Sequence, residues 1–153
     1  MKIYCAHPIS GQTWEQVMEY YTDIESDLSG IGYEVLHPMI GKDALRNEVG
    51  EKFKPADYRS TPVASNHAIF TRDMWMTSQC DVFYLNLLDC SNISIGCMME
   101  LAWAAQLRKH VIVVMQHDNI HRHAFVLEAS SIIFETEIKA FTYLIELIEG
   151  FAV

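Results

Sequence analysis

The stretch DVFYLNLLDCSNISIGCMMELAWAAQLRKHVIVVM, residues 81–115, decides the fold. Residues 81–87 and 111–115 are largely apolar, and both runs have the length of a strand that is buried on both faces. Between them, a polar turn at 91–94 leads into a helical stretch at 95–107 that carries small and apolar residues on most of its faces. A strand, a helix and a second buried strand in succession predict a parallel sheet with crossover helices.

The same alternation continues on both sides of this stretch. Thr13 and Gln16 have the spacing of a capping box and open an amphipathic helix that ends near Gly30. The remaining elements that we expect are strands at 3–6, 33–36 and 132–134, a helix at about 67–80 and an apolar-striped helix at about 138–148. The sequence therefore predicts an open, doubly wound α/β sheet, which binds its ligands at the carboxyl ends of the strands.

Length and composition indicate one folded domain over residues 1–153. Half of the residues are hydrophobic and 20% are charged, which is typical of a globular protein. The formal net charge of −9 argues against a polymeric nucleic acid or an anionic membrane as partner. No apolar stretch resembles a signal peptide or a membrane span, so we expect a cytoplasmic protein. The four cysteines lack CxxC spacing and are expected to be free thiols: Cys5, Cys80, Cys90 and Cys97.

Residues 37–66 show no sustained period and are interrupted by prolines and glycines. Loops of this length commonly serve as lids or binding loops, so we expect a lid-like loop at about 37–66.

The turn and helix after the strand at 81–87 provide a candidate anion site. Ser94 and Gly96 stand where a helix begins, and the free backbone N–H groups and dipole of a helix N-terminus favour an anion such as phosphate. The alternative is that Ser94 is only an N-cap, with Gly96 there for close packing. The two roles can coexist.

Glu100 lies six residues beyond Ser94 among apolar neighbours, where a lone carboxylate is costly to bury. It is therefore a candidate catalytic group, the alternative being a surface glutamate on a half-exposed helix. Asp73 is a second candidate, and the commoner outcome for it is a salt bridge with Arg72 or another neighbour. Tyr4, at the end of the first strand, has ordinary core packing as its alternative.

Three sets of residues together resemble the nucleoside 2-deoxyribosyltransferase superfamily, which includes the nucleoside 5′-monophosphate N-glycosidases. These sets are Ile3-Tyr4, Arg72-Asp73 followed by Asp81, and SIGCMMELAWA at 94–104. The resemblance extends over about residues 2–149. It implies a flavodoxin-like fold, a homodimer or larger assembly, cleavage of the bond between base and sugar, and no metal or organic cofactor. In this comparison Glu100 corresponds to the nucleophile, Tyr4 to the residue that orients it, and Asp73 to the proton donor or positioner at the base.

Ser94 favours the nucleotide-hydrolysing branch. Transferases that accept free nucleosides resemble one another in having an acidic residue here, which would repel a phosphate, whereas the nucleotide hydrolases are similar to this sequence in having serine. Ser10 and Gly11 are candidate further phosphate contacts, and Arg72 would suit the carbonyl group of a pyrimidine. We therefore predict hydrolysis of a (deoxy)nucleoside 5′-monophosphate. The alternatives are base exchange between free nucleosides and a non-catalytic nucleotide-sensing module.

Two further clusters have a functional and a structural interpretation. The residues His117, Asp118, His121 and His123 resemble metal ligands, but they lie in one polar loop without a partner distant in sequence, so we expect no metal. The aromatic residues Phe70, Trp75 and Trp103 could stack on a base, but such residues at helical spacing more often belong to the core.

Overall fold

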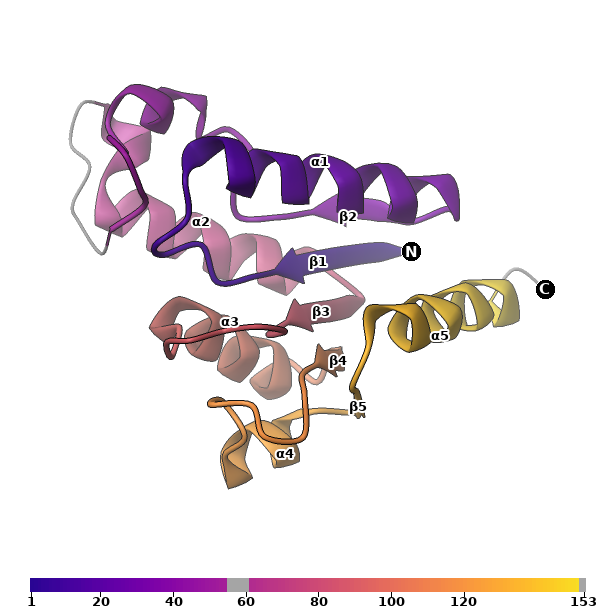
Figure 1. Ribbon diagram of the computed structural model, residues 1–153. Coiled ribbons are helices and arrows are strands. Elements are labelled where there is room, and N and C mark those ends of the chain that lie inside the picture. Colours follow the sequence, from indigo (N-terminus) through magenta and orange to yellow (C-terminus); the bar gives the residue numbers. More distant parts are fainter. Residues whose placement is uncertain (55–60, 152–153) are drawn as a thin grey trace.

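A computed structural model describes residues 1–54 and 61–151 of the chain. A five-stranded, wholly parallel sheet has the order β2-β1-β3-β4-β5 (Figure 1), which is the flavodoxin-like order. The strands are β1 (Lys2–Ala6), β2 (Glu34–Leu36), β3 (Val82–Asn86), β4 (His110–Val114) and β5 (Ile132–Phe134). The helices are α1 (Trp14–Gly30), α2 (Asn66–Gln79), α3 (Ile95–Gln106), α4 (Ala124–Ala129) and α5 (Glu137–Gly150), with short 3₁₀ helices η1 (Asp43–Asn47) and η2 (Pro62–Ala64). The predicted α/β alternation is confirmed, and α4 is an addition to it.

The sheet is covered by helices on both faces because alternate side chains of each strand point to opposite sides. Ile3 and Cys5 of β1 pack with residues of α1 and α5, whereas Tyr4 and Ala6 pack with residues of α2, α3 and α4. β3 runs through the centre, and each of its five residues is buried. This double coverage explains why the central strands are nearly continuous apolar runs.

The strand order reverses between β1 and β3. The chain leaves β1 toward β2 at one edge and then returns to the other side of β1, where β3 pairs with it from Ile3–Val82 to Ala6–Leu85. Loops that leave neighbouring strands in opposite directions open a crevice at the carboxyl ends. The turns after β1 and β3 therefore flank the expected ligand site.

Polar caps determine where the helices begin. Thr13 and Gln16 form the predicted capping box at the start of α1, with both reciprocal hydrogen bonds present. The side chain of Ser94 accepts a hydrogen bond from the backbone N–H of Cys97 and caps α3. Since α3 follows β3 after a short turn, this cap fixes the helix N-terminus beside the crevice.

The described part of the segment 37–66 is more ordered than its lack of period indicates. It contains η1 and η2, which are too short to produce a recognisable sequence period. Leu45, Val49 and Phe53 are buried against the core next to α1. The backbone of Phe53 also exchanges hydrogen bonds with the turn after β1, from Gly11 N–H at 2.9 Å and to the carbonyl of Gln12 at 2.8 Å. Residues 55–60 lie outside the described part, and the role of this segment as a lid stays a prediction.

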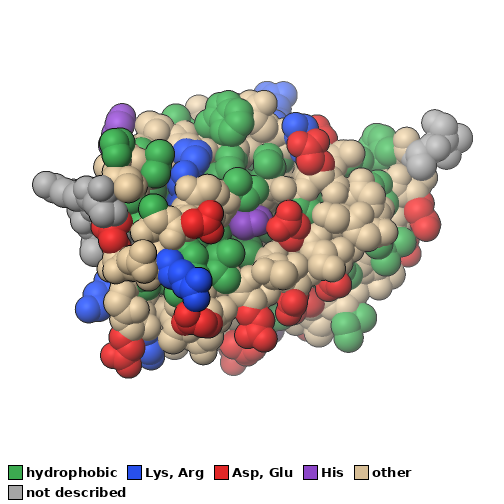
Figure 2. Space-filling model, turned by 90° about the horizontal axis from the view of Figure 1, so that it is seen from above, with side chains coloured by type: hydrophobic (Ala, Val, Ile, Leu, Met, Phe, Trp, Pro, Cys, Tyr) green, Lys and Arg blue, Asp and Glu red, His purple; other side chains and the backbone are tan. Residues whose placement is uncertain are grey.

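The outer surface of α1 is acidic. Glu15, Glu19, Asp23 and Asp27 are exposed at intervals of four residues, and acidic side chains gather along this face in Figure 2. Of the helices within 1–54 and 61–151, none is both long and apolar enough to cross a membrane.

Candidate active site

A cavity of about 540 Å³ lies at the carboxyl ends of β1 and β3, a volume typical of small-molecule sites. The turn after β1, the segment after β2, α2 and the start of α3 each contribute to its wall. Its polar lining residues are His7, Ser10, Lys42, Lys54, Asp73, Asn92, Ser94 and Glu100, with Gly11 and Gly96 among the others. The structure therefore brings together residues more than ninety positions apart in the sequence, such as His7 and Glu100.

Glu100, which lines this cavity, forms a buried pair with Tyr4. The hydroxyl of Tyr4 donates a 2.7 Å hydrogen bond to Oε1 of Glu100, whose side chain comes from α3. Glu100 is only 7% exposed and Tyr4 is fully buried. Burial, with a contribution from the charge of Asp73, raises the pKa of Glu100 from 4.5 to about 8, while the hydrogen bond from Tyr4 acts in the opposite direction. An ionised Glu100 would therefore be a poorly solvated carboxylate with one fixed donor.

Asp73 is paired with Lys42. The ammonium Nζ of Lys42 lies 3.1 Å from Oδ2 and 3.3 Å from Oδ1 of Asp73, and both side chains are buried. Burial raises the pKa of Asp73 and lowers the pKa of Lys42, and the attraction between the two opposes both shifts. The salt bridge expected as an alternative for Asp73 is thus present, but its partner comes from the segment after β2.

Sequence reasoning did not single out Lys42. A lysine in an irregular segment with four other basic residues gives no local sign that it will be buried. Gly41, which precedes it, adopts a φ of +69° in the turn that leads to Lys42.

Arg72 lies outside the cavity wall. Its Nη1 is 3.7 Å from the position that a Cβ on Gly41 would take. Its Nε and Nη2 are buried and have no hydrogen-bond partner among residues 1–54 and 61–151. The contact between Arg72 and a base therefore stays a prediction.

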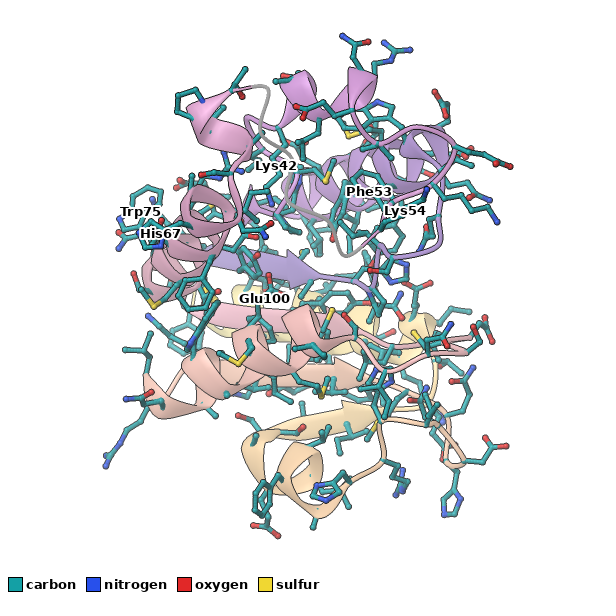
Figure 3. All side chains as sticks on the ribbon, turned by 90° about the vertical axis from the view of Figure 1, so that its left-hand side faces the viewer. Lys42, Phe53, Lys54, His67, Trp75 and Glu100 are labelled. Atoms are coloured by element: carbon teal, nitrogen blue, oxygen red, sulfur yellow. The ribbon has the colours of Figure 1, made fainter. Side chains whose placement is uncertain are left out.

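The opposite end of the cavity is suited to an anion. Ser94 caps α3, and the first N–H groups of a helix, here those of Ile95 and Gly96, have no acceptor within it. Ser10 and Gly11 face the same cavity from the turn after β1, where Gly11 has a φ of +87° that favours glycine. Lys54 also lines the cavity, and Figure 3 shows it beside Phe53, on the segment that faces Glu100. Lys54 was another residue that sequence reasoning missed.

His121 holds the N-terminus of α3 in place. Its Nε2 accepts a 3.0 Å hydrogen bond from the backbone N–H of Ser94, and its Nδ1 lies 3.0 Å from Oδ1 of Asn119. Burial lowers its pKa, which favours the neutral ring that this arrangement requires. His123 caps α4 through its Nδ1. Within the described part of the chain, no group of three or more His, Cys, Asp or Glu side chains could hold a metal ion.

The three aromatic candidates for base stacking are absent from the cavity lining. Trp75 is 59% exposed and lies at the outer edge of α2 in Figure 3, and Phe70 packs edge-on against Trp103. Among the described lining residues, the one Phe, Tyr or Trp is Phe53, which stacks on Trp14.

Comparison with known protein families finds one family that matches most of the chain. Residues 3–146 match the family described as nucleoside 2-deoxyribosyltransferase. This chain belongs to the nucleoside 2-deoxyribosyltransferase family. No curated protein sequence matches it.

Solved structures of nucleoside 2-deoxyribosyltransferase-like proteins share its fold. A 2-deoxyribosyltransferase of Bacillus psychrosaccharolyticus has a TM-score of 0.65 at 18% identity, over 92% of this chain and 90% of that chain. A 2-deoxyribosyltransferase of Leishmania mexicana has a TM-score of 0.62 at 19% identity, over 95% of this chain and 97% of that chain. A CMP N-glycosidase of Clostridium botulinum has a TM-score of 0.58 at 17% identity, over 94% of this chain and 98% of that chain. The family supports glycosyl transfer or N-glycosidase chemistry on a nucleoside or nucleotide.

Proposed function

We propose that this chain hydrolyses the N-glycosidic bond of a (deoxy)nucleoside 5′-monophosphate to a free base and a (deoxy)ribose 5-phosphate. The observation that carries the proposal is the separation of charge within the cavity. Asp73 and Glu100 are the carboxylates among the described residues that line it. The other end presents Ser10, Ser94 and Lys54, which can donate hydrogen bonds to a phosphate.

The first chemical step in this proposal belongs to Glu100. Its ionised carboxylate attacks the anomeric carbon while the bond to the base breaks, and the electron pair of that bond leaves with the base. Tyr4 orients the attacking carboxylate through its 2.7 Å hydrogen bond. Asp73, which lines the cavity from α2, is assigned to the departing base. Water then attacks the glycosyl-enzyme ester and releases the sugar phosphate.

The distance between the two ends suits a nucleotide. Ser94 and Glu100 are six residues apart on one helix, which corresponds to roughly 9 Å along its axis. A sugar above Glu100 would therefore extend its 5′-substituent toward the N-terminus of α3. Free N–H groups and a helix dipole stabilise a phosphate at such a position.

A pyrimidine base is the preferred leaving group in this proposal. The CMP N-glycosidase of similar fold acts on a pyrimidine nucleotide. Arg72, which precedes Asp73 on α2, is assigned to the carbonyl oxygen of such a base, because a guanidinium offers fixed N–H donors.

Base exchange between free nucleosides is the second candidate function. Two of the structures of similar fold are 2-deoxyribosyltransferases, and the glycosyl-enzyme on Glu100 would be common to both reactions. A second base that outcompetes water at this intermediate would convert hydrolysis into transfer.

The deciding experiment is a screen of common nucleosides and 5′-monophosphates, with and without an added acceptor base, followed by liquid chromatography. Glu100→Gln is assayed beside Glu146→Gln, a matched change at an exposed position of α5. We expect base release from monophosphates, its loss in Glu100→Gln and normal activity in Glu146→Gln. Efficient exchange from free nucleosides would establish the transferase instead. Binding without turnover by any substrate would favour a nucleotide sensor.

We further propose a cytoplasmic homodimer. Ile138 on α5 and Phe125 on α4 are large apolar side chains that are 81% and 80% exposed, and a subunit contact would remove them from water. Light scattering at assay concentration tests this, and a fully active monomer would contradict it.

A further inference from the structure

We propose that Lys42 and Asp73 act together as the proton donor for the departing base, with Lys42 as the store of the proton and Asp73 as the group that delivers it. This inference rests on the proposed cleavage of a base–sugar bond, but it applies equally to nucleotides and to free nucleosides.

The geometry points to a shared proton. One ammonium nitrogen lies 3.1 and 3.3 Å from the two oxygens of one carboxylate, in a pair of which Lys42 is 4% exposed and Asp73 8% exposed. Both side chains line the cavity that also contains Glu100. The pair therefore borders the cavity into which the proposed substrate would place its base.

A lone aspartate would be a poor acid here. An ordinary aspartic acid is ionised at neutral pH and holds no proton to give. The pair differs because it holds one transferable proton in either form, as ammonium with carboxylate or as amine with carboxylic acid. Burial favours the neutral form of each partner, so the two forms are brought closer in free energy than in water.

The proton balance closes over one turnover. As the bond from the anomeric carbon to the base nitrogen breaks, Asp73 passes a proton to the base and receives one from Nζ of Lys42. The base leaves neutral, and an ester joins Glu100 to the sugar. Water, or the N–H of an acceptor base, then attacks the anomeric carbon and releases its proton to the pair, which restores the ammonium and the carboxylate.

An arrangement in which Lys42 merely anchors the segment after β2 to α2 would give the same distances. The two roles differ in their dependence on the leaving group. A proton donor matters only when the base needs a proton, whereas an anchor matters for every substrate.

The test compares each natural substrate with the matching 4-nitrophenyl glycoside, which releases a phenolate that needs no proton at neutral pH. Both the 5-phosphate and the unphosphorylated glycosides are used. Lys42→Met removes the proton store, and Lys42→Arg keeps a positive charge but does not release a proton. Lys52→Met, at an exposed position of the same segment, is the matched control.

We expect both Lys42 variants to lose at least a hundredfold in kcat on the natural substrate and less than fivefold on the nitrophenyl glycoside, with Lys52→Met unchanged. An equal loss on both substrates, or normal turnover of the natural substrate by Lys42→Arg, would overturn the proposal. Circular dichroism establishes that the variants are folded.

A rescue experiment gives a readout that does not depend on the synthetic substrate. Ethylammonium should raise the activity of Lys42→Ala on the natural substrate at least tenfold over its activity without an added cation. Tetramethylammonium, which carries a charge but has no proton on its nitrogen, should not. Equal rescue by both cations would refute proton storage on Lys42. If the wild-type chain cleaves only free nucleosides, the proposed substrate class fails while this proton donor is still tested.

Discussion

Tyr4 and Glu100 are separated by ninety-six positions in the sequence, yet a 2.7 Å hydrogen bond joins the phenol of the first strand to the carboxylate of α3. Both side chains are buried, and Glu100 and Asp73 are the two buried carboxylates among the described residues. Burial of a carboxylate costs free energy, and such a cost is retained in proteins mainly where the group has a function.

Replacement of Glu100 by Gln should stabilise the protein at high pH. The pKa of Glu100 is raised from 4.5 to about 8, so the folded state favours the protonated form, and wild-type stability is lost as the pH rises between these values. Glutamine keeps the acceptor for Tyr4 but does not ionise. We expect the variant to be more stable by roughly 5 kcal/mol at pH 9 and nearly equal at pH 4. Urea unfolding at both pH values measures this, and a less stable variant at pH 9 would contradict it.

Tyr4→Phe should shift the pH dependence of catalysis. The hydrogen bond from Tyr4 lowers the pKa of Glu100, so its removal raises that pKa and leaves less ionised nucleophile at neutral pH. We expect the acidic limb of the kcat/KM profile to move to higher pH, with about a tenfold loss at pH 7 for each unit of movement. Tyr33→Phe is the control, since its hydroxyl donates to the carbonyl of Leu144 instead. An unshifted limb would show that Tyr4 has no influence on Glu100.

Ser94→Asp should change the preferred substrate while the helix cap is kept. Aspartate is as good an N-cap as serine, so the thermal midpoint should change little. Its carboxylate would repel a 5′-phosphate and accept a hydrogen bond from a 5′-hydroxyl. We expect kcat/KM for the monophosphate to fall at least a hundredfold relative to that for the free nucleoside. An unchanged ratio would mean that no phosphate lies near Ser94.

Lys54→Met tests the other side of the same anion site. Lys54 lines the cavity on a segment that is hydrogen-bonded to the Ser10–Gly11 turn through Phe53. The loss of its charge should raise KM for the monophosphate about tenfold, equivalent to roughly 1.4 kcal/mol, and leave KM for the nucleoside unchanged. An equal rise for both substrates would identify a structural role.

His121→Leu should weaken the start of α3 in a pH-dependent manner. The pKa of His121 is lowered by burial below its ordinary 6.5, so the stability that it provides is present above pH 6.5 and is lost as the pH falls. Leucine removes the acceptor of the Ser94 N–H, and we expect a loss of about 1–2 kcal/mol at pH 8 that narrows toward pH 5. Thermal unfolding at the two pH values measures the difference. His117→Leu, at an exposed position of the same loop, should have no such effect.

The family and most of the elements were predictable from sequence for a local reason. These elements depend on residues only a few positions apart, so they leave local patterns in the sequence. The patterns are the apolar runs of buried strands, the apolar stripes of helices and the caps at Thr13 and Ser94. Glu100 was also recognisable as a carboxylate among apolar residues, whereas Asp73 took its proposed role from the family resemblance. The short helix α4 and the 3₁₀ helices were missed because they are too brief to show a period.

By itself, the sequence determined the parallel α/β sheet, the helix N-terminus at Ser94 and the carboxylates available for catalysis. Only the tertiary structure decided which groups meet: that Lys42 is the cation beside Asp73, that Lys54 lines the same cavity as Ser94, and that His121 accepts the backbone N–H of Ser94. The hydrophobic periodicity of a sequence reflects the geometry of a helix or strand, which places residues a few positions apart on the same face. Contacts across thirty or more positions depend on the order of the strands and on the path of the segment after β2, and no local pattern encodes these.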